Sequence, residues 1–331
     1  MKTYLGVDGG GSKTRFLLID ETGKVLASHT EGPAYYLEIG LDALRSRLTR
    51  GIEQTLQNGN VTPSALTFAF IGLPAYGEDR TIEPMLDAAP SSVLPPGRYR
   101  CGNDMVCGWA GALAGADGIN IVAGTGSIAY GEYEGRSARA GGWGELFSDE
   151  GSAYWLAREG LTLFSRMSDG RSPRGPLYEL VRRHFSLRDD IDLCASIYGQ
   201  DVSQRSQFAQ LSKLIAEAAR ADDPAARGLF ARAAAELADM VDAVRDELRV
   251  PAEMVLALSC SGGLFELRDL VHEQFERTIG GRDRRYRFLR ARLPPDAGAV
   301  VLAAKRAGTP LEVASLGALE GAMQRPGSLR A

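Results

Sequence analysis

The chain has 331 residues, which is enough for about two domains of ordinary size. Charged residues make up 24% and hydrophobic residues 44% of it, and this composition excludes the disordered, collagen-like and coiled-coil classes. The net charge of -4 argues against a protein that binds nucleic acid or other polyanions in general.

The first half predicts short strands separated by glycine turns. Of the 39 glycines, 26 fall in residues 1–160, and glycine permits close backbone approaches that other residues forbid. Apolar runs and periodicity predict strands at 4–7, 16–19 and 25–28, a helix at 41–57, strands at 66–71 and 98–101, and a helix at 105–113. Strands at 119–123 and 128–133 then repeat the opening pattern of strand, glycine turn and strand.

The second half predicts mainly helices, over residues 151–167, 208–221 and 225–248. Ser148 or Asp149 is well placed to cap the first of them. A buried strand at 255–258 leads into a third glycine turn, and the chain from residue 317 onward is expected to fray.

Cysteine usage and hydropathy bear on the compartment. No run approaches the roughly 18 apolar residues that span a bilayer, and the N-terminal run meets Asp8 too early for a signal-peptide core. The four cysteines are scattered and lack zinc-site spacing. We therefore expect a cytoplasmic protein with reduced thiols and no membrane partner.

The first glycine turn, Gly9 to Thr14, nearly matches a Walker A loop. It departs because Ser12 separates Gly11 from Lys13 and because a strand follows where a helix N-terminus is needed. A glycine hairpin still presents several N–H groups to a phosphate, so a phosphate loop and a purely structural hairpin stay equally open.

Two further turns support the phosphate interpretation. The turn Gly124-Thr125-Gly126-Ser127 follows a second strand, so two turns could hold one polyphosphate from opposite sides. Gly262 and Gly263 follow a third strand, where glycine lets a flat ring or ribose lie against the backbone. An ordinary turn into a helix remains the alternative for this third pair.

Taken together, these segments resemble the BadF/BadG/BcrA/BcrD-type ATPases, in particular the N-acetylglucosamine kinase branch of the actin, sugar-kinase and heat-shock chaperone superfamily. The resemblance is carried by Gly6–Thr14, Gly102-Asn103-Asp104, Ala123–Ser127, Gly141–Gly144, Ser148–Trp155 and Asp296–Ala299. It implies an α/β fold of two actin-like (ribonuclease H-like) lobes with an interlobe nucleotide and sugar cleft. The expected lobes are residues 1–113 with 297–310, and residues 114–296, followed by a tail at 311–331.

The resemblance also implies ATP, Mg²⁺ and a sugar substrate. Asp104 matches the general base that faces the sugar 6-hydroxyl, and its alternative role is a helix N-cap. Asp8 matches the residue that orients Mg²⁺ through water. The residues expected to bind the nucleotide are Gly10, Gly11, Ser12, Lys13, Thr14, Gly124, Thr125, Gly126, Ser127, Ala219, Gly262 and Gly263. Those expected to line the sugar pocket are Tyr35, Asp104, Gly142, Trp143 and Asp149.

Two departures from the family pattern lie near the expected sugar. Tyr35 stands where these kinases carry an asparagine, and Gly72-Leu73-Pro74-Ala75 replaces the usual Gly-Leu-Ser/Ala-Gly. The nucleotide turns are intact, so kinase chemistry is better supported than the identity of the sugar. N-acetylglucosamine and glucosamine are the favoured substrates.

Two other functions would require features beyond these residues. An ATP-driven reductase or dehydratase activator of this family would need clustered cysteines for a bridging iron–sulfur cluster. A non-catalytic sugar sensor would need an added DNA-binding domain. The arginine-rich stretch 282–292 is expected to be a solvated edge strand. These kinases are often dimers, so the resemblance allows for a homodimer.

Overall fold

The computed structural model describes residues 1–199 and 205–324, and its contacts divide them into two compact units. Unit 1 combines residues 1–117 with the described residues from 290 onward, and unit 2 holds the described residues of 118–289. Each unit encloses its own hydrophobic core, which is the defining property of a domain. Within the described part of the chain, no helix is long and apolar enough to cross a membrane.

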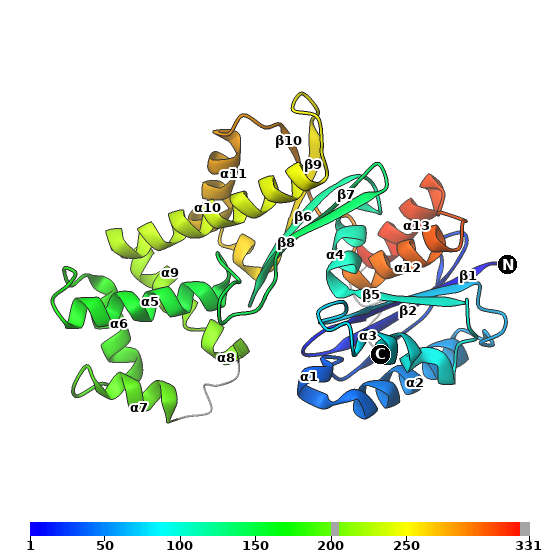
Figure 1. The fold of residues 1–331 in the computed structure, drawn as a ribbon, viewed down its shortest axis with the longest axis horizontal. Coiled ribbons are helices and arrows are strands. Elements are labelled where there is room, and N and C mark those ends of the chain that lie inside the picture. The colour runs from blue at the N-terminus through cyan, green and yellow to red at the C-terminus, as the bar shows by residue number, and fades with distance from the viewer. Residues whose placement is uncertain (200–204, 325–331) are drawn as a thin grey trace. The chain divides into compact units, whose positions relative to one another are not determined.

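Unit 1 is built on a five-stranded mixed sheet in the order β3-β2-β1-β4-β5. Strands β1 (Thr3–Gly9), β2 (Thr14–Asp20) and β3 (Val25–Glu31) are antiparallel, whereas β4 (Phe68–Leu73) and β5 (Tyr99–Asn103) run parallel to β1. Its helices are α1 (Tyr36–Ile39), α2 (Leu41–Asn58), α3 (Glu83–Ala88), α4 (Asp104–Leu113), α12 (Pro295–Arg306) and α13 (Val313–Gln324). Helices α1 and α2 cover one face of the sheet, and α4 and α12 cover the other (Figure 1).

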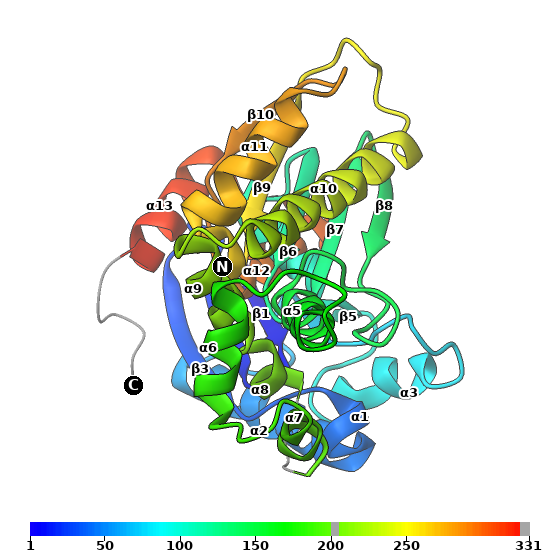
Figure 2. The ribbon, with the colours of Figure 1, turned by 90° about the vertical axis from the view of Figure 1, so that its left-hand side faces the viewer.

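Unit 2 repeats this topology in the order β10-β9-β6-β7-β8. Strands β6 (Gly118–Ala123), β7 (Ser127–Tyr133) and β8 (Arg136–Gly141) are antiparallel, and β9 (Leu256–Ser261) and β10 (Tyr286–Leu289) extend the sheet in parallel with β6. Its helices are α5 (Ala153–Ser168), α6 (Pro176–Phe185), α7 (Asp192–Tyr198), α8 (Arg205–Ala209), α9 (Ser212–Arg220), α10 (Pro224–Glu247) and α11 (Glu273–Gly280). Helix α10 runs along the sheet with α11 beside it (Figure 2).

The repeated strand–turn–strand pattern in the sequence therefore marks the start of two sheets with the same strand connections. Glycine also serves this packing directly. A Cβ atom at Gly6 in β1 would lie 2.5 Å from the Val300 nitrogen, so α12 rests against β1 at that glycine. At Gly298 in α12, a Cβ would overlap the backbone of α4. Helix α12 thus packs closely against β1 at Gly6 and against α4 at its own Gly298, because neither glycine has a side chain.

Several details differ from the sequence-based expectations. Residues 114–117 and 290–296 pack in unit 1, where the Leu293 N–H donates to the Gly111 carbonyl at 3.0 Å. Residues 313–324 of the expected tail form α13, and residues 325–331 lie outside the described part of the chain. The helix expected over 208–221 is broken into α8 and α9.

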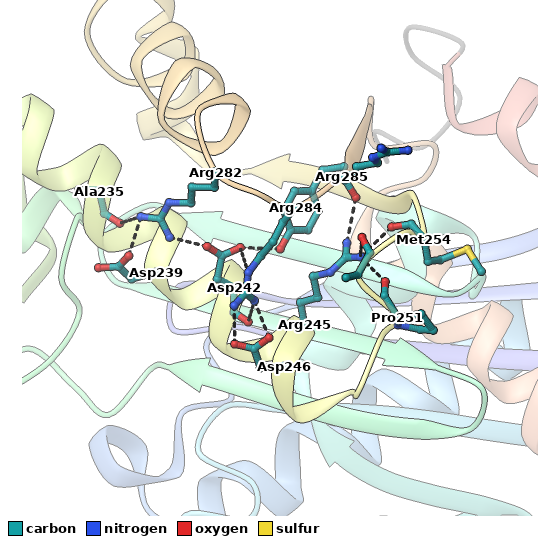
Figure 3. A network of polar contacts seen from close by, with 12 residues as sticks. Ala235, Asp239, Asp242, Arg245, Asp246, Pro251, Met254, Arg282, Arg284 and Arg285 are labelled. Atoms are coloured by element: carbon teal, nitrogen blue, oxygen red, sulfur yellow. Dashed lines mark hydrogen bonds and ion pairs between the residues drawn. The ribbon is translucent and has the colours of Figure 1, made fainter.

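The arginine-rich stretch does lead into an edge strand, β10, but two of its arginines are not simply solvated (Figure 3). Arg282 pairs with Asp239 and Asp242 of α10. Arg284 pairs with Asp246 one turn further along the helix, at 2.6 Å. These ion pairs fasten the segment before β10 to α10.

Candidate active site

The carboxyl ends of three parallel strands meet at one edge of the unit 1 sheet. In the register, Asp8 of β1 lies beside Gly72 of β4, and Gly72 lies beside Gly102 of β5. Asp104 follows β5 directly as the first residue of α4. A Cβ at Gly72 would lie 3.2 Å from the Asp104 Cα, so the glycine lets α4 begin close against β4. The topology therefore brings Asp8 and Asp104 to the same edge, where ligands bind in open α/β sheets.

The carboxylates at this edge repel one another. Burial raises the pKa of Asp104 to about 6, and the charge of Glu78 adds to the rise. Burial raises the pKa of Asp8 to about 8, with the charges of Asp104 and Asp296 acting in the same direction. Asp296, at the start of α12, also has its pKa raised by burial. A group of acids held this way is suited to exchanging a proton or to facing a cation.

Asn103, not Asp104, is the N-cap of α4. Its Oδ1 accepts from the Met105 N–H at 3.0 Å, so the N-cap alternative for Asp104 is wrong. Its Nδ2 donates to the Tyr76 carbonyl at 3.0 Å and holds the loop that follows β4. The role of Asn103 was not predicted from the sequence, although an asparagine just before a helix is a strong N-cap signal.

The first glycine turn is a tight hairpin with an exposed tip. The Gly10 N–H donates to the Lys13 carbonyl at 2.9 Å, and Gly11, Ser12 and Lys13 are exposed. Backbone N–H groups and an ammonium at such a tip are suitable donors for a phosphate. Thr14 differs, because its side chain is buried.

Thr14 and its neighbours connect this turn to the segment that contains Tyr35. The Thr14 hydroxyl donates to the Gly32 carbonyl at 2.8 Å. The Ala34 N–H donates to the Gly10 carbonyl at 2.9 Å, which places the half-buried Tyr35 just beyond the turn. Two expected site elements, the phosphate turn and Tyr35, are thus joined by backbone contacts.

In unit 2, the second glycine turn is bonded to the start of α5. The Ala153 N–H donates to the Gly124 carbonyl at 2.9 Å, and the Tyr154 N–H to the Thr125 carbonyl at 3.2 Å. The Ser127 hydroxyl donates to the Glu150 carbonyl at 2.6 Å. Ser127 therefore holds the turn in shape, as Thr14 does in unit 1.

Asp149 lies next to this turn, and its side chain is only 2% exposed. Its φ of 59° is left-handed, and the N-cap of α5 is Ser152, whose Oγ accepts from the Trp155 N–H at 3.1 Å. The expectation that Ser148 or Asp149 caps α5 is therefore wrong. The Asp149 carboxylate instead pairs with Arg205 of α8, a residue that sequence analysis did not single out.

Gly142 and Trp143 follow β8. Gly142 has a φ of 69°, in the region that favours glycine, and Trp143 is 67% exposed. The Arg139 guanidinium lies over the indole, 5.3 Å from its centroid. An exposed indole next to backbone polar groups is suited to packing against a sugar ring.

The third glycine turn and Ala219 have clear structural explanations. Gly262 has a φ of 97°, and a Cβ there would overlap the Ala123 carbonyl, so the contact between β9 and β6 itself requires glycine. Gly263 has no such neighbour within 4 Å. The Ala219 side chain is fully buried in the core of unit 2, and its carbonyl accepts from Arg227 at 2.9 Å. A nucleotide role for these residues remains a prediction.

The donor set at the unit 1 edge fits a magnesium ion bound mainly through water. Within residues 1–199 and 205–324, no three His, Cys, Asp or Glu side chains gather closely enough to form a metal cage. Magnesium usually binds through one or two carboxylates and keeps several waters. The negative charges of Asp104 and Asp296 repel that of Asp8. A nearby cation would therefore stabilise the ionised form of Asp8 most.

Comparison with known proteins identifies the family of this chain. Residues 5–303 match the model of the BadF/BadG/BcrA/BcrD ATPase family. An N-acetyl-D-glucosamine kinase of Dictyostelium discoideum is 28% identical, covering 91% of this chain and 97% of the relative. An N-acetylmuramic acid/N-acetylglucosamine kinase of Clostridium acetobutylicum is also 28% identical, covering 92% and 98%. The structure of a putative N-acetylglucosamine kinase from Chromobacterium violaceum superposes with a TM-score of 0.69 at 27% identity, covering 91% and 99%.

Proposed function

Because the chain belongs to the BadF/BadG/BcrA/BcrD ATPase family, we propose that it uses ATP to phosphorylate the 6-hydroxyl of a hexose or amino sugar. The names of the two kinases described above support phosphorylation of a sugar and favour N-acetylglucosamine as the acceptor, and a glucosamine kinase of Vibrio cholerae, 26% identical over 72% of this chain and 78% of the relative, favours glucosamine. The single observation that carries the proposal is Asp104, held at the carboxyl end of β5 with its pKa raised to about 6.

Asp104 is proposed as the general base. A base works best when its pKa lies near the working pH, because it is then ionised yet still able to hold a proton. A pKa of about 6 meets both conditions at neutral pH. Asp104 would accept the proton of the sugar hydroxyl as that oxygen bonds to the transferred phosphoryl group.

The phosphates of ATP are proposed to bind at the two hairpin turns. Gly11, Ser12 and Lys13 offer exposed donors in unit 1, and Gly10, whose N–H bonds to the Lys13 carbonyl, is proposed to shape the turn around the phosphate. Gly124, Thr125 and Gly126 offer backbone groups in unit 2. Thr14 and Ser127 support these turns through their bonds to backbone carbonyls. Asp8 would hold Mg²⁺ through water, and the ion would neutralise phosphate charge.

Asp149, Gly142, Trp143 and Tyr35 are proposed to recognise the sugar acceptor. Asp149 is proposed to accept hydrogen bonds from sugar hydroxyls, while Gly142 and Trp143 form the adjoining wall. Tyr35 takes the place of an asparagine in the family pattern and is proposed to pack against the sugar through its ring.

Gly262, Gly263 and the end of α9 at Ala219 would flank the adenosine.

The proposal is tested by measuring ADP release with ATP and Mg²⁺ in the presence of single sugars. Glucosamine, N-acetylglucosamine, N-acetylmuramic acid and glucose are compared with a reaction that contains no sugar. We expect strong stimulation by at least one amino sugar and a product phosphorylated at the 6-position by NMR. Folded protein that no sugar stimulates would contradict the kinase assignment.

A further inference from the structure

Asp149 is tied to a second element of unit 2 through one arginine. Arg205 is the first residue of α8, and its guanidinium pairs with the Asp149 carboxylate through Nη2. Its Nε lies 3.1 Å from the Oε2 of Glu145. We infer that Arg205 is a positioning residue for sugar recognition, which it serves by orienting the Asp149 carboxylate. This inference rests on the proposed function.

The position of Arg205 is set by packing between helices. The Phe208 ring of α8 packs on the Tyr154 ring of α5, with centroids 4.7 Å apart. Tyr154 is the second residue of α5, the helix whose first N–H groups bond to the second glycine turn. Helix α8 is therefore fixed relative to Asp149 through α5, and Arg205 projects from a supported element.

The contacts of Asp149 leave part of its acceptor capacity unused. The Arg205 guanidinium engages Oδ2, and the Ser127 N–H approaches Oδ1 at 3.4 Å. A carboxylate has about four lone-pair positions, so two remain for sugar hydroxyls. With one oxygen held by a guanidinium, the plane of the carboxylate is defined before the sugar arrives, and less ordering is needed on binding.

Gly126 of the second glycine turn lies against the Asp149–Arg205 ion pair. A Cβ at Gly126 would lie 2.8 Å from the Asp149 Oδ2 and would overlap the Arg205 guanidinium. A side chain at this position would have to displace the Arg205 guanidinium or the Asp149 carboxylate, so glycine leaves room for the pair. The pair therefore lies directly against the proposed phosphate turn.

Charge explains why Arg205 is needed. Asp149 is buried, and burial raises its pKa, whereas Arg205 and the Ser127 N–H lower it and Glu145 raises it. Removing the Arg205 charge leaves a buried carboxylate beside Glu145, which favours protonation. A protonated carboxyl has a different hydrogen-bonding pattern and no charge, so it binds hydroxyls more weakly.

We expect variants of Arg205 to fold. Its side chain is 39% exposed and borders a cavity of about 550 Å³, so shortening it encloses no new void. Arg205→Gln removes the charge, and Arg205→Lys keeps the charge but loses the planar fork. Arg284→Gln is the matched control, because Arg284 is 29% exposed and pairs with Asp246 away from these residues (Figure 3).

The test measures ADP release over a range of sugar, ATP and pH for the wild type and the three variants, with folding checked by circular dichroism. For Arg205→Gln we expect the KM for the sugar to rise about tenfold or more, while the KM for ATP changes less than about twofold. The acid limb of kcat/KM for the sugar should move to higher pH. Arg205→Lys should restore part of the loss, and Arg284→Gln should match the wild type.

The outcomes separate this inference from the proposed function. A wild type that no sugar stimulates contradicts the kinase proposal, and with it the role given to Arg205. A wild type that is active, with a folded Arg205→Gln variant of unchanged sugar KM and pH profile, overturns only the inference. An equal rise in the KM for sugar and for ATP would also overturn it, because that pattern indicates general damage to unit 2.

Discussion

The side chain of Asn103 joins the loop after β4 to the start of α4. Its Nδ2 donates to the Tyr76 carbonyl while its Oδ1 caps the helix at Met105, each at 3.0 Å. Asp104 is the next residue, so the direction of its carboxylate depends on how α4 begins. This loop is also the segment in which Pro74 and Ala75 depart from the family pattern.

Replacing Asn103 should therefore weaken both stability and catalysis. Asn103→Ala removes the cap and the bond to the loop, and we expect a loss of about 1–2 kcal/mol in the free energy of unfolding. We also expect kcat to fall more than the KM for ATP rises. Asn103→Ser keeps a capping oxygen but loses the donor to Tyr76, so it should recover stability without recovering all activity. Urea titration and steady-state kinetics on both variants would check this, and full activity in Asn103→Ala would contradict it.

The proposed base predicts a definite pH dependence. Asp104 must be ionised to accept a proton, and its pKa is raised to about 6, so kcat should decrease as the pH falls through about 6. Asp104→Asn keeps the shape but removes the base, and we expect kcat to fall about 10²–10⁴-fold with ATP binding retained. Kinetics from pH 5 to pH 9 and a nucleotide-binding titration test both points. Retained turnover in Asp104→Asn would remove Asp104 as the base.

Asp8 should make the ligand-free protein less stable as the pH rises. Its pKa is about 8 in the folded chain and near 4 when unfolded, so between these values the folded state binds more protons. The stability that Asp8 contributes is therefore fully present below about pH 4 and is lost progressively as the pH rises to about 8. Asp8→Asn should raise the Tm at pH 8.5 relative to the wild type and raise it much less at pH 5. It should also weaken the dependence of activity on Mg²⁺. A lower Tm at pH 8.5 would contradict the repulsion among these acids.

Much of the strand framework could be predicted from the sequence, because strands such as β1, β2 and β6 are apolar runs ended by glycine turns. Strand β8 could not, since residues 136–141 combine two arginines with small side chains and have no apolar run, and they pair along β7. The N-cap of α5 was misplaced because Asp149 and Gly151 both adopt left-handed φ, which moves the helix start to Ser152.

Local sequence patterns predict the candidate site only where its residues are contiguous in the chain, and the separated segments were linked only by the family resemblance. The acids at the unit 1 edge come from β1, α4 and α12, so no spacing in the sequence links Asp8 to Asp296. Arg205 was missed for the same reason: it lies 56 residues from Asp149 in a polar stretch, and only the packing of α8 on α5 brings the two together. Such contacts are decided by tertiary structure, which local patterns do not encode.

The two adjacent glycines after β9 allow structure and nucleotide binding to be separated. Gly262 has a φ of 97°, and a Cβ there would overlap the Ala123 backbone, so Gly262→Ala should destabilise unit 2 by more than about 2 kcal/mol. Gly263 has open space around it, so Gly263→Ala should leave the free energy of unfolding within about 1 kcal/mol of the wild type. If the adenosine lies against this turn, Gly263→Ala should still raise the KM for ATP while leaving the KM for the sugar unchanged. Thermal unfolding with paired ATP and sugar titrations would measure these effects. Unchanged kinetics in a stable Gly263→Ala protein would show that the turn serves the fold alone.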